Sequence, residues 1–193
     1  MVVLVIGLVL FLGVHSTRIV APDFRARFIA QRGEGAWKGL YSIVSLIGFV
    51  LIVWGYGLSR LDPVVLYVPP EWLRHVSLLI MLPVFILLAA AYLPGHIKAR
   101  AKHPMLVAVK LWALAHLIAN GTLADLLLFG AVLAWAVVDR ISVKRRPVEA
   151  PGHGASAPPS ARNDAIAVVV GLALYVAFVL FLHRWLIGVS PIG

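Results

Sequence analysis

Apolar residues occur along this chain in long, nearly uninterrupted runs that short polar stretches separate. Six of these runs approach or exceed the ~20 helical residues that a hydrocarbon core of ~30 Å requires. They cover residues 1–19, 39–58, 72–94, 104–119, 122–139 and 165–187. The pattern predicts an all-α fold, a polytopic membrane helix bundle with about six transmembrane helices. The first run lacks a basic n-region and a small-residue cleavage site, so we expect a helix of the mature protein rather than a signal peptide.

Composition supports the membrane class and limits the chemistry. Of the 193 residues, 62% are hydrophobic and 13% are charged, and the mean hydropathy is +0.97, which no ordinary soluble domain of this size approaches. The chain has no cysteine. Any metal must therefore be bound by histidine, carboxylate or backbone groups, because thiolate ligands and disulfides are excluded.

The basic residues are distributed unevenly between the connections. Thirteen of the 17 Lys and Arg residues fall within residues 18–38, 95–103 and 140–164, which the predicted spans place on one side of the membrane. By the positive-inside rule this side is cytoplasmic, and both termini are expected to be periplasmic. The same bias accounts for the net charge of +9, so the expected partner is the lipid bilayer and not nucleic acid.

Two connections differ in kind from the rest. Residues 143–164 are rich in Pro, Gly, Ala and Ser, which predicts a flexible cytoplasmic linker. This linker would join a five-helix core, residues 1–142, to a loosely attached C-terminal transmembrane helix in residues 165–193. Residues 58–72 contain aromatic residues and prolines that suit an interfacial lid on the outer surface.

Local sequence signals predict turns, caps and a kink in the third, fourth and fifth helices. Asn120-Gly121 predicts a tight reversal, which would make these helices an antiparallel hairpin. Thr122 and Asp125 have the spacing of a capping box, so we favour a structural role for Asp125 over a proton relay. Pro83, in the middle of the third helix, predicts a kink.

Four ionisable residues within or beside the predicted spans are candidates for function, because charge is costly in a membrane. They are His15, His103, Lys110 and His116. At 100° per residue, His103 and Lys110 share one face of their helix, whereas His116 lies about 140° from His103. Lys110 can extend back to water, or contact an anion such as a cofactor carboxylate. His103, directly before a proline, can simply cap its helix.

His116 and His15 form a possible ligand pair. A buried histidine is more often hydrogen-bonded than metal-bound, so each residue alone favours a structural role. Together they suggest iron, because neutral imidazole is a good iron ligand and a porphyrin fills apolar space between helices. Their positions on the predicted helices put the two Cα atoms roughly 13 Å apart along the membrane normal, which permits a bis-His haem.

Further residues suit such a pocket. Arg18 could pair with a haem propionate, and Trp112 shares the helical face of His116. Ser42, Ser45 and Gly48 form a stripe that admits either a flat ring or another helix, of which helix packing is the simpler interpretation. The other histidines are interpreted as interfacial or loop residues: His75, His96, His153 and His183.

Five sequence blocks carry a resemblance to a known family. LFLGVHSTR with YSIVSLIGF, LYVPPEW, KHPMLVAVKLWALAHLIANG and WAVVDR occur in that family's order and reach to about residue 146. Together they resemble the NnrU family, which implies a multi-pass protein of the bacterial inner membrane encoded near denitrification functions.

A weaker resemblance extends to plant 15-cis-ζ-carotene isomerase, a membrane protein that holds haem b. It implies iron ligation by the histidine of the first-helix GVHS block and by the histidine thirteen residues after the His-Pro pair. These are His15 and His116, the pair already singled out. The isomerase has a cysteine three residues before its second histidine, where this chain has Ala113, so a thiolate switch is excluded.

The sequence leaves three hypotheses for function. The leading one is a bis-His haem b protein that acts on nitric oxide or, as an enzyme, isomerises an apolar polyene. The second is a non-enzymatic accessory subunit of a respiratory complex such as a nitric oxide reductase. The third is a membrane methyltransferase of the isoprenylcysteine type, which the KHPMLVA stretch resembles only in part, because no Glu-Glu pair follows.

Overall fold

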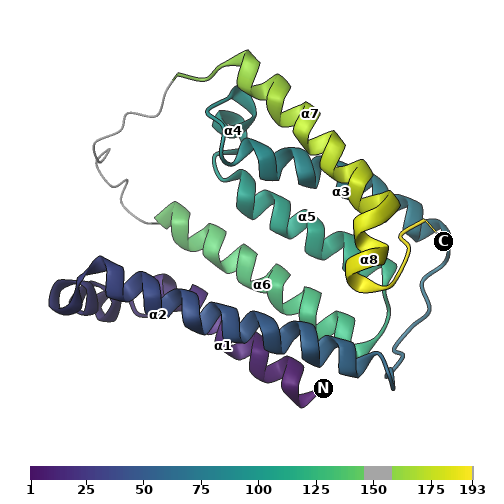
Figure 1. Cartoon of the computed structure of the whole chain (residues 1–193), viewed down its shortest axis with the longest axis horizontal. Coiled ribbons are helices and arrows are strands. Elements are labelled where there is room, and N and C mark those ends of the chain that lie inside the picture. Colours follow the sequence, from purple (N-terminus) through teal and green to yellow (C-terminus); the bar gives the residue numbers. More distant parts are fainter. Residues whose placement is uncertain (146–157, 193) are drawn as a thin grey trace. The chain divides into compact units, whose positions relative to one another are not determined.

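The computed structural model describes residues 1–145 and 158–192, and all secondary structure in these residues is helical apart from one isolated β-bridge. The described helices fall into two units, labelled in Figure 1. Unit 1 comprises residues 1–67 and 121–145, and unit 2 comprises residues 68–120 and the chain from 146 onward. The all-α prediction is confirmed.

Five helices among the described residues are long and apolar enough to cross a membrane, as expected of a multi-pass membrane protein. The remaining predicted span, Pro104–Ala119, is a shorter apolar helix of 16 residues, about 24 Å long at 1.5 Å per residue. Its length is therefore below the usual thickness of a hydrocarbon core.

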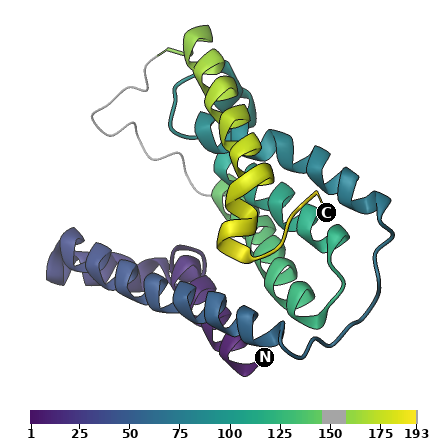
Figure 2. The same ribbon diagram turned by 45° about the vertical axis from the view of Figure 1, so that its right-hand side comes forward.

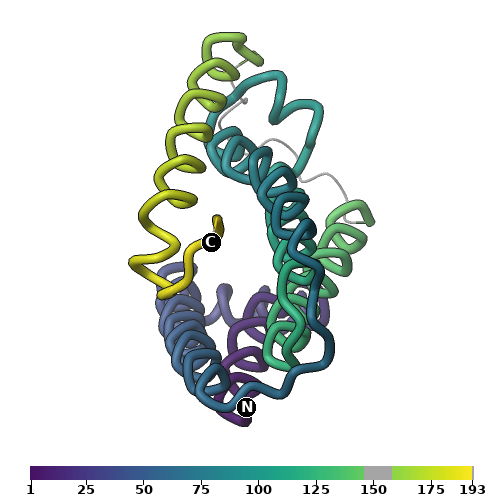
Figure 3. The backbone as a smooth tube through the Cα atoms, turned by 90° about the vertical axis from the view of Figure 1, so that its right-hand side faces the viewer, coloured from purple at the N-terminus to yellow at the C-terminus, as the bar shows by residue number. Residues whose placement is uncertain are grey.

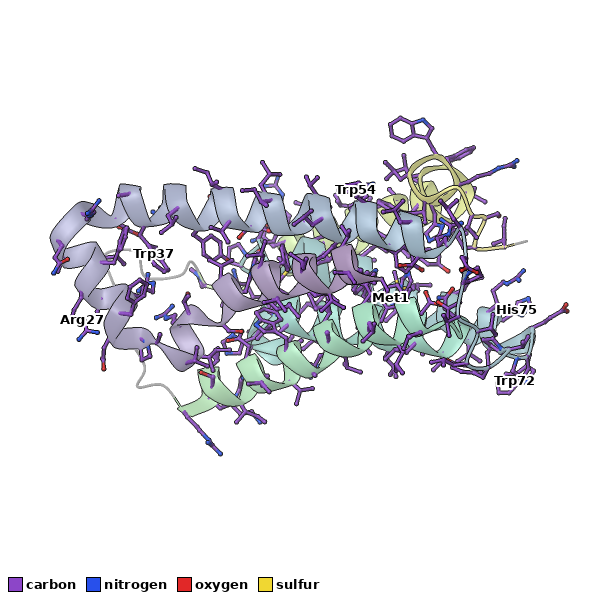
Figure 4. All side chains as sticks on the ribbon, turned by 90° about the horizontal axis from the view of Figure 1, so that it is seen from below. Met1, Arg27, Trp37, Trp54, Trp72 and His75 are labelled. Atoms are coloured by element: carbon purple, nitrogen blue, oxygen red, sulfur yellow. The ribbon has the colours of Figure 1, made fainter. Side chains whose placement is uncertain are left out.

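Unit 1 contains α1 (Val2–Val20), α2 (Pro22–Ser59) and α6 (Leu123–Arg145). Helices α1 and α2 lie side by side in Figures 1 and 4. Their backbones approach closely at Gly48, where an added Cβ would lie 2.7 Å from the backbone nitrogen of Phe11. At Gly48, therefore, the small-residue stripe on α2 serves helix packing.

Helix α2 begins much earlier than predicted, because the basic stretch interpreted as part of a loop is helical. Pro22 occupies the first turn and Asp23 adds a favourable charge there. Gly33, with φ 83° and ψ 160°, then separates two helical segments. Trp37 is buried against the rings of Phe24 and Phe28 from the first segment, and Figure 4 shows it between the two segments.

The Asn120-Gly121 step is extended instead of a tight turn. Asn120 has φ −131° and ψ 146°, and Gly121 is not among the described residues with positive φ. Backbone pairing with residues 64–66 replaces the turn: Leu66 N–H donates to Gly121 O at 2.8 Å, and Leu123 N–H donates to Val64 O at 2.8 Å. Helices α5 and α6 belong to different units, so the predicted hairpin stays a prediction.

In its described residues, unit 2 contains five α-helices and one π-helical turn. They are α3 (Trp72–Ala90), α4 (His96–Ala101), α5 (Pro104–Ala119), α7 (Ala161–Ala177), the π-helix η1 (Phe178–Leu182) and, after it, the short α8 (His183–Ile187). Helix α3 packs against both α5 and α7. Pro83 lies inside α3, and the helix continues on both sides of this proline.

Helix α7 is held to α3 by a close backbone contact. At Gly171 an added Cβ would lie 2.6 Å from the Cα of Ile86. This contact groups α7 with α3 in unit 2, and the expected division into a core, a linker and a C-terminal helix stays a prediction. Most of the predicted linker, residues 146–157, lies outside the described residues, but its two ends are helical and belong to α6 and α7.

Figures 2 and 3 show α7, η1 and α8 as one continuous rod, followed by a tail that turns back along it. The turn is made at Gly188, whose φ of 79° is readily adopted by glycine. The tail then returns toward α8.

Candidate functional site

The candidate residues from the sequence are divided between the two units. Unit 1 contains His15, Arg18 and Ser45, whereas unit 2 contains His103, Lys110, Trp112 and His116. The surroundings of each histidine are therefore described within its own unit.

His15 lies in an aromatic cluster of unit 1. Its ring centroid is 4.2 Å from that of Phe11 on α1, 5.0 Å from that of Tyr41 on α2, and 5.8 Å from that of Trp135 on α6. Three helices thus fix the position of one half-buried imidazole.

One hydrogen bond fixes the tautomer of His15. Its Nδ1 lies 2.6 Å from the carbonyl oxygen of Phe11, one turn earlier on α1. A carbonyl oxygen can only accept, so Nδ1 carries the proton and Nε2 carries the lone pair of the neutral ring. Metal-bound histidines are held in the same way, with the second ring nitrogen donating to a carbonyl or carboxylate.

Two buried polar atoms near this cluster have no hydrogen-bond partner within the described residues: Ser45 Oγ and Trp135 Nε1. Such atoms are rare, because an unsatisfied buried donor costs about 1–3 kcal/mol. Trp135, which was not among the residues predicted from the sequence, is thus both a ring neighbour of His15 and a buried donor without a partner in the described residues. Arg18, in the last turn of α1, is exposed.

His116, on α5 in unit 2, repeats the arrangement of His15. Its Nδ1 lies 2.8 Å from the carbonyl oxygen of Trp112, one turn earlier, so Nε2 again carries the lone pair. The rings of Trp112 and His116 are 5.0 Å apart. Asn120 continues this side of the helix by donating from Nδ2 to the carbonyl oxygen of His116 at 2.8 Å.

His116 lines a cavity of about 200 Å³ that lies entirely within unit 2. Its apolar walls come from α3, α5 and the π-helix and include Met81, Phe85, Ala115, Phe178 and Val179. Arg74, His183 and Ser190 are among its polar lining residues. His183 was expected to be only an interfacial residue, but its ring lies 6.5 Å from that of His116, with an angle of 24° between the planes.

Other candidate residues take no part in this cavity. His103 is the N-cap residue of α5, but its side chain makes no capping hydrogen bond, and Pro104 begins the helix. Lys110 is partly exposed on the same helix and is not among the lining residues. No group of three or more His, Cys, Asp or Glu residues suited to a metal ion occurs in residues 1–145 and 158–192.

A family model described as NnrU protein matches residues 3–191, nearly the whole chain. The chain belongs to the NnrU family. Comparison with curated proteins and with solved structures gave no match. NnrU membership therefore confirms the family named from five sequence blocks, and it extends the likeness through α7 and α8, beyond residue 146.

Proposed function

We propose that this NnrU protein binds haem b in a bacterial inner membrane, with His15 and His116 as the axial ligands of the iron. The observation that carries the proposal is the arrangement shared by the two imidazoles. Each donates from Nδ1 to the carbonyl oxygen one turn earlier on its own helix. Each is therefore fixed as the tautomer whose Nε2 can bind a metal.

The residues around His15 suit a porphyrin with acidic substituents. Phe11, Tyr41 and Trp135 offer aromatic surface to a flat ring. The orphaned Trp135 Nε1 can donate to an oxygen atom of a bound group, which would remove its desolvation cost. Arg18, one turn from His15 on α1, can pair with a propionate at the helix end.

Haem, when bound, would supply an iron centre that could bind nitric oxide or polarise a double bond of an apolar polyene, and these are the two activities that the resemblances favour. This chain would position the iron, tune it through Nδ1 hydrogen bonds and exclude water with apolar walls.

An accessory-subunit role has less support than it had from the sequence. It rested largely on a loosely attached last helix that could dock on a partner. Helix α7 instead packs on α3 through the close contact of Gly171 with Ile86. We therefore develop only the haem-binding function.

The test is an absorption spectrum of protein produced with a haem supply and purified in detergent. We expect a Soret band and, after reduction, the sharp α and β bands of six-coordinate low-spin iron. His116→Ala should lose the low-spin bands, and His15→Ala should alter them, whereas the control His75→Ala, at an exposed position, should not. A wild-type protein without a Soret band contradicts the proposal. So does a variant that combines His15→Ala with His116→Ala and still has the wild-type spectrum.

A further inference from the structure

The cavity of unit 2 has two different ends, because α5 and α7 both run antiparallel to α3. Ser77 of α3 donates to the carbonyl oxygen of Ala115, near the end of α5, at 2.7 Å. Gly171 of α7 contacts Ile86, whereas four residues later Tyr175 reaches back to the carbonyl oxygen of Leu78. The end of α5 and the residues after α7 therefore approach the start of α3.

The end of the cavity beside the start of α3 is polar and positive. Arg74 lies in the first turn of α3, Asn120 is the C-cap of α5 and His183 begins α8, and all three line the cavity. No aspartate or glutamate is among the described lining residues, and Arg74 forms no ion pair within residues 1–145 and 158–192. A guanidinium that is not paired to a carboxylate favours an anionic partner at this end.

The other end of the cavity is aromatic. Phe85, about three turns after Arg74 on α3, has its ring centroid 5.1 Å from that of Phe178 and 6.1 Å from that of Tyr175. We call these three rings the aromatic floor. The hydroxyl proton of Tyr175 is already engaged with Leu78 O at 3.1 Å. The part of a ligand that reaches the floor is therefore apolar, because a polar atom buried there would lack a partner.

The volume limits the ligand to a small molecule. The cavity holds about 200 Å³. A cavity of about 150 Å³ accepts benzene, and sites for drug-sized ligands measure about 300–1,000 Å³, so the ligand has about 8–12 non-hydrogen atoms. A single ring or a short alkyl chain with one acidic group has this size, whereas a macrocycle does not. The ligand of this cavity is therefore not haem.

We infer that this cavity binds a small amphipathic carboxylate, whose acidic group contacts Arg74 and His183 and whose ring or short alkyl chain lies against the aromatic floor. Arginine suits a carboxylate because its guanidinium can donate two parallel hydrogen bonds. Nδ1 of His183 is engaged with the carbonyl oxygen of Val189 at 2.7 Å, so Nε2 is the ring nitrogen available to the acid. The same bond holds the tail after Gly188 at the cavity, which Ser190 also lines. This site goes beyond haem binding and does not require it.

The experiment uses two probes that differ only in their polar end, para-fluorophenylacetate and para-fluorophenylethanol. Fluorine NMR follows each probe during titration with the full chain, purified in detergent without added haem, and empty micelles are the blank. The wild-type protein should bind the acid more tightly than the alcohol. Arg74→Gln should weaken binding of the acid about five- to tenfold and leave binding of the alcohol unchanged. Arg184→Gln, at an exposed arginine outside the cavity, is the matched control and should change neither.

A second variant tests the apolar end. Val179 lines the cavity, so Val179→Phe fills part of it and should weaken binding of both probes at least about tenfold. Val176→Phe, at a residue 49% exposed and outside the cavity, is its matched control. Competition by unlabelled phenylacetate and by hexanoate then compares a ring with an alkyl chain. Displacement of the acid probe by either compound supports the inference and identifies the apolar part.

Three results overturn the inference: wild-type binding no greater than to empty micelles, equal affinity for the acid and the alcohol, or acid binding that Arg74→Gln leaves unchanged. Unchanged affinity in a folded Val179→Phe protein also overturns it, because the probe then binds elsewhere. If Val179→Phe is not monodisperse by size exclusion, the two probes with Arg74→Gln decide alone. None of these results bears on haem, since the titration involves no iron, and absence of a Soret band leaves this inference in place.

Discussion

The hydroxyl of Tyr56 donates a 2.6 Å hydrogen bond to the carboxylate of Asp125, which joins α2 to the first turn of α6. Asp125 is only 4% exposed. It also accepts from the backbone N–H and the hydroxyl of Thr122, at 2.9 and 2.6 Å, while its own N–H donates to Thr122 Oγ1 at 3.3 Å. The predicted capping box is thus confirmed, and Asp125 serves as an acceptor shared by two helices.

Loss of this carboxylate should destabilise unit 1 more than loss of one donor. Asp125→Ala leaves three donors without their acceptor, and we expect a loss of about 3–5 kcal/mol in the free energy of unfolding. Tyr56→Phe removes one bond to a charged group, at a cost of about 1.5–3 kcal/mol. Denaturation in detergent measures both. Asp62→Ala, which removes an exposed carboxylate, is the control, and an equal effect at positions 62 and 125 would contradict the shared-acceptor role.

Close packing of α1 on α2 predicts a position-specific effect of adding one methyl group. Gly48→Ala places Cβ 2.7 Å from the backbone nitrogen of Phe11, so the helices must separate, at a cost of about 1–3 kcal/mol. Gly39→Ala meets nothing within 4 Å and should be neutral or slightly stabilising, because alanine favours a helix. Thermal unfolding compares the two, and a Gly48→Ala protein as stable as Gly39→Ala would disprove the close approach.

The first turn of α4 depends on a residue far away in the sequence. The carboxylate of Asp164, on α7, accepts from the backbone N–H groups of His96 and Ile97 at 3.0 and 2.9 Å. Asp164→Ala should therefore weaken α4 and speed amide exchange there several-fold. Asp164→Asn keeps one oxygen acceptor and should have a smaller effect. Hydrogen exchange of peptides that contain residues 96–101 measures this effect. Unchanged protection of these peptides in Asp164→Ala would contradict the prediction.

Trp135 gives a prediction that separates cofactor binding from stability. Trp135→Phe removes a buried donor that has no partner in the described residues, so the ligand-free protein should lose little stability or gain some. If Trp135 Nε1 donates to bound haem, the same change should weaken haem affinity about tenfold. Haem titration followed at the Soret band tests this, and Trp54→Phe, at a side chain 57% exposed, is the control. Unchanged affinity in Trp135→Phe would exclude the donor role.

The sequence predicted the helical class and most helix positions because the apolar runs are long and their boundaries are sharp. It failed at residues 22–38, where basic side chains were taken as the sign of a loop. The signals for a helix there are local and weak: a proline at the first turn, an acidic residue beside it, and Phe24 and Phe28 one turn apart.

The candidate site was predicted in part. The apolar runs of the sequence indicate that His15 and His116 lie within membrane helices. In the structure, Nδ1 of each histidine is hydrogen-bonded to a carbonyl oxygen. No spacing along the chain indicates that Trp135 lies against His15, or that His183 lies beside His116. These neighbours are set by packing between distant helices, and His183 depends in addition on a π-helical turn that periodicity at 100° per residue does not anticipate.

The π-helix has a consequence for length variation in this chain. A π-turn contains one more residue than the α-helical turn it replaces, so a helix can absorb a one-residue deletion there without breaking. Such a deletion within Phe178–Leu182 would convert the π-turn to an α-turn and leave everything that follows at nearly the same rotation, whereas a deletion within the regular helix α7 would rotate it by about 100°. Relatives that lack this residue would therefore keep the imidazole of His183 at its place, so the end of this helix can vary in length by one residue while that side chain keeps its position.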